Sequence, residues 1–318
     1  MLGTGAQGRR AVTLEWQAVP ALTSWRFGLA TALGEQIPAE LYGTAGPQMR
    51  YWQALAPALP PASRAANAEL AASAGVFSSA GLIDLYSEIG QDAAADDTPE
   101  AGTARDLRIA YTDGDVADRM SAIRSLWSAA RTPRAAYGRL ILTARAASWI
   151  PAAASVDEPE RLIASMLSAG MEAPAMEWRN VVKRGSEGWA LLTLADPGDA
   201  PVAYGDFDVY GDVAGRRKAQ LMLAGLAGLG RLEAADAQRG ATALDVPIGA
   251  VNSWTKAIDA AGQRGDSALV AILAAAGMQS LSWDYVTPEA LFHIVSAMKA
   301  AGMGGYARMI AVEAISRA

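Results

Sequence analysis

The sequence of 318 residues contains no cysteine and a single histidine. Without cysteine the chain has no disulfide bonds, no thiolate metal ligands and no cysteine nucleophile. One histidine leaves the common zinc sites and the Ser-His-Asp triad without their main component. These absences exclude most familiar enzyme classes, and we expect no metal, no cofactor and no catalytic residue.

Charge and long apolar runs are also scarce. Charged residues make up 19% of the chain and the net charge is -6, so we expect no binding of nucleic acid. The longest apolar runs, 221–230 and 268–278, reach about half of the ~20 residues that a membrane-spanning helix requires. No signal peptide is predicted from the first residues. We expect a cytoplasmic protein, or a periplasmic one if an export signal has been removed.

The sequence does have apolar residues with helical spacing, and 52% of its residues are hydrophobic. The segment after Asp115, an expected N-cap, shows the spacing most clearly. Its apolar residues recur at steps of four, three and four: Val116, Met120, Ile123 and Trp127. Segments 157–170 and 287–302 show the same helical spacing of apolar residues, with proline near the start and glycine at the end. Strand signals are limited to 206–210, so the pattern predicts an all-α fold.

The tripeptide Ala-Gly-Met occurs three times, at 169–171, 276–278 and 301–303. Glycine closes a helix easily because it adopts positive φ, and the next apolar residue packs back over the last turn. We therefore expect corners between helices at Gly170, Gly230, Gly262, Gly277 and Gly302. Stacked helical hairpins of this kind form an irregular α-solenoid or superhelix.

Three segments are expected along the chain. They are an N-terminal helical segment (1–92), central helical hairpins (93–198), and a loop followed by C-terminal hairpins (199–318), together forming one continuous solenoid. An acidic stretch at 90–105 is expected to be an exposed loop or hinge. A longer connection at 195–217 is also predicted to lack regular structure, and such long connections are often functional.

The C-terminal sequence WDYVTPEALFHIVSAMKAAGMGGYARMIAVEAISRA resembles the Ala-rich α-helical-repeat proteins of alphaproteobacteria, a group of uncharacterised function. It is more distantly similar to tetratricopeptide-type solenoids, although the 34-residue spacing and the Trp-Leu-Gly-Tyr pattern of those repeats are not reproduced. The resemblance implies a helical-repeat fold. It carries over no functional residue, because no activity is known for the group.

The connection at 195–217 is the best candidate site. Its carboxylates and aromatic side chains are Tyr204, Asp206, Phe207, Asp208, Tyr210 and Asp212. Carboxylates at alternate positions could hold a hard cation, but Arg217 stands where a calcium loop has its bidentate glutamate. The other interpretations are a solvated ordered loop and a partner-binding loop. We take these six residues and Trp283 as candidates for partner binding, because aromatic side chains dominate binding hot spots when they are exposed.

Other conspicuous residues have ordinary structural interpretations. His293 lies beside an apolar stripe and is expected to be a packed or edge residue without nearby carboxylates. Ser186 is expected to cap a helix, since it lacks the strand that precedes a nucleophile elbow. We therefore expect a non-enzymatic scaffold that binds a protein or peptide. The alternatives are a helical arm of a glycan-acting envelope enzyme, marked by a buried glutamate in a cleft, and a structural component of an envelope assembly, marked by an exposed apolar patch.

Overall fold

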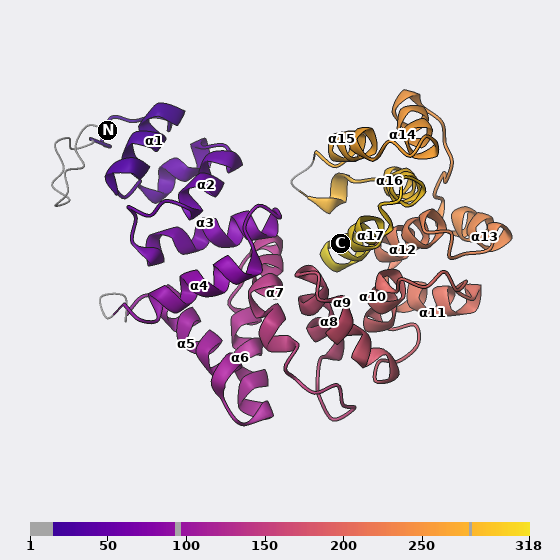
Figure 1. The fold of residues 1–318 in the computed structure, drawn as a ribbon, viewed down its shortest axis with the longest axis horizontal. Helices are drawn as coiled ribbons and strands as arrows, with labels where there is room; N and C mark the ends of the chain where they lie inside the picture. Colours follow the sequence, from indigo (N-terminus) through magenta and orange to yellow (C-terminus); the bar gives the residue numbers. More distant parts are fainter. Residues whose placement is uncertain (1–14, 93–96, 280–281) are drawn as a thin grey trace. The chain divides into compact units, whose positions relative to one another are not determined.

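The computed structural model describes residues 15–92, 97–279 and 282–318, and within these residues it contains helices and no strand (Figure 1). Helices account for 69% of the described residues. The predicted all-α fold is confirmed, while the solenoid arrangement stays a prediction. Every described helix is too short or too polar to cross a lipid bilayer.

The chain divides into two compact units, Met1–Ala146 and Ala147–Ala318. The described part of the first unit contains α1 (Ser24–Leu33), the 3-10 helix η1 (Ala39–Thr44), α2 (Pro47–Ala54), α3 (Pro61–Ser73), α4 (Ser79–Ile89), α5 (Pro99–Thr112), α6 (Val116–Ser128) and α7 (Pro133–Ala147), whose last residue begins the second unit. Each helix from α2 to α5 packs against the next one along the chain. The expected N-cap Asp115 is confirmed, since its side chain accepts a hydrogen bond from the Ala117 amide at the start of α6.

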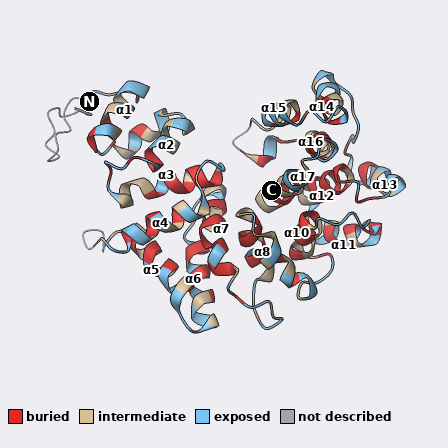
Figure 2. Ribbon diagram, viewed as in Figure 1, coloured by how far each residue is buried: buried red, intermediate tan, exposed pale blue. Residues whose placement is uncertain are grey.

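Small side chains bring the helices of the first unit close together. Four alanines of α3 are buried in the main core of this unit: Ala65, Ala68, Ala71 and Ala72. Leucine and isoleucine side chains from α4 and α7 and a leucine from α5 pack around these alanines. Because the distance between two packed helices depends on the side chains at their contact, the small alanines allow a close approach. Figure 2 shows buried and exposed residues along the same helices, as expected for amphipathic elements.

The second unit is arranged around one almost wholly buried helix. Its described elements are α8 (Pro159–Ser168), α9 (Glu172–Met176), the 3-10 helix η3 (Glu177–Asn180), α10 (Glu187–Ala195), α11 (Tyr204–Ala214), α12 (Arg216–Gly228), α13 (Ala234–Leu244), α14 (Ser253–Gln263), α15 (Ser267–Gly277), the 3-10 helix η4 (Trp283–Tyr285), α16 (Pro288–Ala300) and α17 (Gly304–Arg317). Helix α12 packs against α10, α11, α13, α16 and α17. Its apolar run is therefore a core helix that is hydrophobic on most sides.

Three of the expected corners are confirmed as left-handed glycines. Gly170, Gly230 and Gly302 follow α8, α12 and α16 with φ of 71°, 64° and 78°. Only glycine adopts this conformation without a steric penalty, so each one ends a helix and turns the chain.

The other two glycines serve a different purpose. Gly262 lies inside the last turn of α14, and the left-handed residue that follows this helix is Gly265, so the predicted corner is off by three residues. A Cβ atom on Gly262 would lie 2.8 Å from the Cα atom of Ala297. Gly277 does end α15, but there a Cβ atom would meet the ring of Trp254 at 2.5 Å. Both positions need glycine because another element approaches closely.

The prediction of a long loop at 195–217 is wrong over most of its length, because Tyr204–Ala214 is helix α11 and α12 begins at Arg216. The aromatic residues of α11, Tyr204, Phe207 and Tyr210, recur every three positions and are buried. Interleaved aspartates and glycines, which are weak helix formers, hid this stripe.

The predicted loop at 90–105 is wrong from residue 99 onward. Helix α5 begins there, with Pro99 in its first turn and the Thr98 side chain accepting a hydrogen bond from the Ala101 amide. Proline at the first helical position after a threonine cap is a standard helix start. Residues 93–96 of this stretch lie outside the described residues.

Candidate functional site

The six candidate residues between 204 and 212 all lie on α11, and the helix separates them onto different faces. The three aromatic side chains, Tyr204, Phe207 and Tyr210, face the core. Asp208 and Asp212 are exposed and lie one helical turn apart. Asp206 is half-buried, and its Oδ2 atom lies 3.4 Å from Nη1 of Arg184 in the segment before α10.

This arrangement does not gather the three carboxylates. Residues two apart on a helix differ by about 200° in direction, so Asp206 and Asp208 point away from each other. Across the described residues no group of three acidic or histidine side chains is placed to hold a metal ion. The carboxylates of α11 therefore act at two separate places on the surface.

The first of these places is a small cavity, which we call the acidic pocket. It has a volume of about 220 Å³ and is lined by Tyr204, Phe207, Asp208, Gly211, Asp212, Arg216, Ala219, Ala243 and Leu244. The guanidinium of Arg239 stacks on the Tyr204 ring at 4.1 Å, and Arg216 donates to the Leu244 carbonyl at 2.7 Å. Asp208 and Asp212 have no hydrogen bond or ion pair with any described residue, so their carboxylates stay available to a cation.

A second, larger cavity, which we call the arginine pocket, lies on the α10 side of α11. Its volume is about 360 Å³. The lining residues are Arg179, Asn180, Val182, Arg184, Trp189, Leu192, Thr193, Asp196 and Arg231. They come from η3, the segment that follows it, α10, and the residues just after α10 and α12. Ser186 holds the start of α10 in place, because its side chain accepts a hydrogen bond from the Trp189 amide, as predicted.

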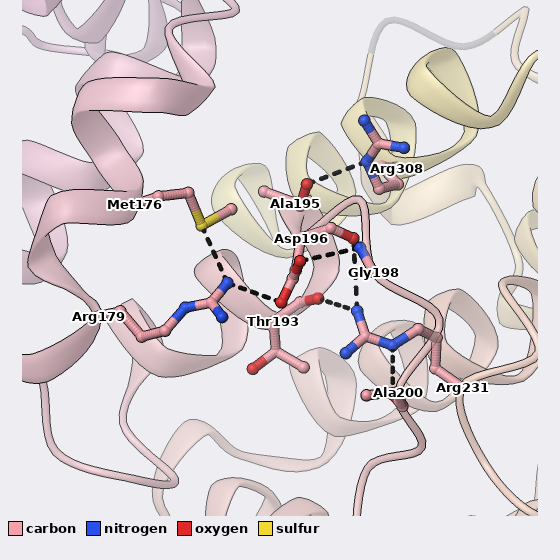
Figure 3. Close-up of polar contacts among 9 residues, drawn as sticks. All are labelled: Met176, Arg179, Thr193, Ala195, Asp196, Gly198, Ala200, Arg231 and Arg308. Atoms are coloured by element: carbon pink, nitrogen blue, oxygen red, sulfur yellow. Dashed lines mark hydrogen bonds and ion pairs between the residues drawn. The ribbon is translucent and has the colours of Figure 1, made fainter.

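Asp196 organises one wall of the arginine pocket (Figure 3). Its carboxylate accepts hydrogen bonds from the Gly198 amide at 2.9 Å and from Nη2 of Arg179 at 2.6 Å. Burial alone would raise the pKa of Asp196, but the Gly198 amide and Arg179 outweigh burial and hold that pKa below its usual value. Asp196 is therefore ionised at neutral pH and fixes Arg179 at the pocket.

Arg231 forms the opposite wall and is buried, with 6% of its surface exposed. Its Nη1 atom donates to the Thr193 carbonyl at 2.7 Å and its Nε atom donates to the Ala200 carbonyl at 2.8 Å. Burial lowers the pKa of Arg231, yet arginine remains charged in proteins. Figure 3 shows that Arg179 and Arg231 approach Asp196 and Thr193 from opposite sides.

Several donors of the arginine pocket remain available. Nη2 of Arg231 and Nη1 of Arg179 make no hydrogen bond to any described residue, and Arg184 is mostly exposed. The lining holds three guanidinium groups and one carboxylate, that of Asp196, so it carries a positive charge. Guanidinium groups bind carboxylates and phosphates through paired N–H donors. The pocket is therefore suited to an anionic group.

Trp283, the seventh candidate, lies in η4 and is not part of either pocket. Only 9% of its surface is exposed, and its indole nitrogen lies 3.4 Å from Oε1 of Glu313. Arg217 donates to its backbone carbonyl at 2.7 Å. Among the other tryptophans, Trp178 is buried and Trp25 is exposed, so the residue type alone does not indicate a binding surface.

The sequence did not point to Arg179 and Arg231. One available signal was that Arg231 directly follows Gly230, the glycine that closes α12. A cation at a helix end can reach carbonyls that the helix leaves without partners. Here those carbonyls belong to a different helix end, that of α10.

His293 is a packed residue, as predicted, but it has a carboxylate partner. It is buried, with 4% exposed, and its Nδ1 atom lies 2.9 Å from Oδ1 of Asp259 on α14. The expectation of no nearby carboxylate is wrong, because the partner is 34 positions away and is brought close only by the packing of α14 on α16.

Glu69 is the buried glutamate that the glycan-enzyme alternative requires, but its surroundings do not suit that chemistry. Its Oε1 atom accepts a hydrogen bond from the Tyr86 hydroxyl and lies 3.0 Å from Nη2 of Arg139. Burial raises the pKa of Glu69, against the opposing effects of Arg139 and Tyr86. A general acid in a glycosidase must reach the glycosidic oxygen from a cleft. Glu69 instead has its carboxylate bound within the core of the first unit.

Comparisons of the chain with protein-family models, curated proteins and solved structures find no match. Its function is therefore inferred from the side chains of the described residues. The two pockets beside α11 are the strongest evidence among them.

Proposed function

We propose that the protein is a non-enzymatic helical-repeat scaffold, an irregular solenoid, that binds a protein or peptide partner. The partner contacts α11 and the two pockets beside it. The observation that carries this proposal is that cavities of opposite charge lie on two helices in contact, the acidic pocket on α11 and the arginine pocket on α10. Arg184 of the arginine pocket pairs with Asp206 of α11. A partner segment with one acidic and one basic residue is complementary to this surface.

The acidic residue of the partner enters the arginine pocket. A carboxylate there accepts hydrogen bonds from the available donors of Arg179 and Arg231. The side chain of Arg231 loses little further conformational entropy on binding, because the carbonyls of Thr193 and Ala200 already hold its guanidinium. Preorganised charged donors of this kind bind an anion more tightly than mobile surface cations do.

The basic residue of the partner enters the acidic pocket. Its ammonium or guanidinium pairs with Asp208 and Asp212, and its aliphatic stem packs against the aromatic wall. Val209 and Val213 lie beside these aspartates on α11 and are 49% and 74% exposed. An apolar centre with charged groups at its edges is the usual composition of a protein interface.

A displayed random-peptide library, selected on the full chain, tests this proposal. We expect the selected peptides to carry an acidic and a basic residue at a constant spacing. Their affinity should fall about tenfold or more in Arg179→Ala, because each lost charge-assisted contact is worth roughly 1.5–3 kcal/mol. Arg264→Ala is the matched control, since Arg264 is an exposed cation of the same unit outside both pockets.

Two outcomes would reject the proposal. One is a selection without charged consensus positions. The other is an equal loss of affinity in Arg179→Ala and Arg264→Ala, which would show that only the net charge matters.

A further inference from the structure

The first unit contains a cavity that does not depend on the proposed partner site. It is a groove of about 310 Å³ between α4 and α5, and we call it the α4–α5 groove. It is lined by Ile83, Tyr86, Ser87, Gly90, Gln91, Ala104, Leu107, Arg108, Tyr111 and Thr112. At one end the two helices approach closely, because a Cβ atom on Gly90 would lie 3.4 Å from the Cβ atom of Ala104. Its volume is at the lower end of the range of about 300–1,000 Å³ that small-molecule sites occupy.

The walls of the groove are apolar and fixed. Ile83 and Leu107 contribute aliphatic side chains from opposite helices. The hydroxyl of Tyr86 is bonded to Glu69 in the core, and the Arg139 guanidinium lies 5.8 Å from the Tyr86 ring centroid. Tyr86 is therefore held in one position and offers the groove its ring. A rigid apolar wall lowers the entropy that a ligand must give up on binding.

The groove has one charged lining residue, Arg108. The two aliphatic hydroxyls in the lining donate to carbonyls of their own helices, Ser87 to Ile83 at 2.9 Å and Thr112 to Arg108 at 2.8 Å. The guanidinium of Arg108 makes no hydrogen bond or ion pair with any described residue and is exposed. An apolar groove with a single available cation is complementary to a ligand with an apolar body and one negative charge.

We propose that the α4–α5 groove binds a small amphipathic monocarboxylate. The apolar body lies between Ile83, Leu107 and the Tyr86 ring, and the carboxylate pairs with Arg108. A neutral ligand of the same shape gains the apolar contacts but not the ion pair. A ligand with two charges leaves one of them without a cation in the groove.

Titration calorimetry with decanoate and with decan-1-ol tests this proposal on the full chain. We expect saturable binding of decanoate, with an affinity up to about fivefold above that of decan-1-ol, since Arg108 is exposed and an exposed ion pair contributes at most about 1 kcal/mol. Arg108→Gln should remove this difference and leave decan-1-ol binding unchanged. Arg105→Gln, which changes an exposed cation of the same helix outside the groove, should keep the difference.

Filling the groove gives an independent readout. Ser87 is exposed at its edge, so Ser87→Leu places a side chain in the groove without altering the buried core. We expect this variant to lose the binding of both probes at least tenfold while its circular dichroism spectrum stays unchanged. Thr112→Leu, on the facing helix, provides a second filling variant if Ser87→Leu does not fold. The proposal is overturned if decanoate does not saturate, if both filling variants bind it normally, or if Arg108→Gln and Arg105→Gln behave alike.

Discussion

The two units of the chain stabilise their buried polar groups in different ways. In the first unit buried side chains pair with each other: Asn67 donates to Gln53, and Glu69 binds Tyr86 and Arg139. The second unit also has such a pair, the buried His293 with Asp259, but here several long cations donate to backbone carbonyls as well. These bonds run from Arg217 to Trp283 and Val286, from Arg231 to Thr193 and Ala200, from Lys299 to Leu229, and from Arg308 to Ala195.

A buried charge is stabilised in two ways in this chain, by an oppositely charged side chain or by backbone carbonyls. Glu69 and Arg139 neutralise each other, so either residue alone is an uncompensated charge in the core. Arg231 instead donates to the carbonyls of Thr193, in the last turn of α10, and Ala200, and it lines the arginine pocket. Burial thus encloses the charges of Glu69 and Arg139, whereas the buried Arg231 lines a pocket.

The largest expected effect comes from breaking the pair in the first unit. Glu69→Ala leaves Arg139 without its carboxylate, and we expect the free energy of unfolding to fall by about 3–5 kcal/mol. Urea denaturation followed by far-ultraviolet circular dichroism measures this change. Glu88→Ala is the control, because Glu88 forms an exposed pair with Arg64 and such pairs contribute about 0–1 kcal/mol. Similar losses in the two variants would show that the buried pair has no special role.

A smaller loss is expected when the backbone contacts of the second unit are removed. Arg231→Met keeps the apolar stem but leaves the Thr193 and Ala200 carbonyls without this donor, which should cost about 2–4 kcal/mol. The same denaturation experiment measures it. Arg264→Ala should change stability by less than about 0.5 kcal/mol. If Arg231→Met changes the free energy of unfolding as little as Arg264→Ala does, water replaces the guanidinium and the arginine pocket is not preorganised.

Two glycines test the close packing of helices in each unit. Gly262→Ala places a methyl group 2.8 Å from Ala297, and we expect overpacking to cost about 1–3 kcal/mol. Gly102→Ala in α5 has open space within 4 Å of its Cβ position, so it should stabilise the first unit by about 0.5–1 kcal/mol. Thermal unfolding of both variants measures whether the first substitution lowers stability and the second raises it. A stabilising Gly262→Ala would contradict the close approach of α14 and α16.

The smallest expected effect is a difference in pH dependence. The pKa of Glu69 is raised above its usual 4.5 by burial, so the folded state retains this proton longer and stability falls as the pH rises through that range. The pKa of Asp196 is lowered below its usual 3.8 despite burial, by Gly198 and Arg179, so its contribution is lost as the pH falls below that value.

Denaturation at steps between about pH 3 and 7 measures both effects, as the difference between wild type and either Glu69→Gln or Asp196→Asn. The stability of wild type relative to Glu69→Gln should fall as the pH rises, whereas its stability relative to Asp196→Asn should rise with pH. Curves with the same sign would contradict the contrast between the units.

Much of the helical architecture could be predicted from local sequence. The Asp115 cap, the Pro99 helix start that the loop prediction overlooked, and the left-handed Gly302 are each specified within one helical turn. Helix α11 was missed because Gly205 and Gly211 weaken its propensity, while burial of Phe207 against neighbouring helices compensates. Tertiary packing, which is not visible in a short window, determines that helix.

The candidate site was predicted only in part. Asp208 and Asp212 were recognised because they lie close together in sequence with aromatic neighbours. The arginine pocket was not, since Arg179, Asp196 and Arg231 are separated by 17 and 35 positions and meet only in the folded unit. Neither the spacing of these residues nor their type distinguishes them from ordinary surface charges.

A charge-reversal experiment tests the proposed partner surface most directly. The affinity of one selected peptide is measured for wild type and for Asp208→Lys/Asp212→Lys, together with a second peptide whose basic residue is replaced by glutamate. The proposal predicts that the reversed protein loses the first peptide and binds the second. Unchanged binding of the first peptide to the reversed protein would contradict a partner site on α11.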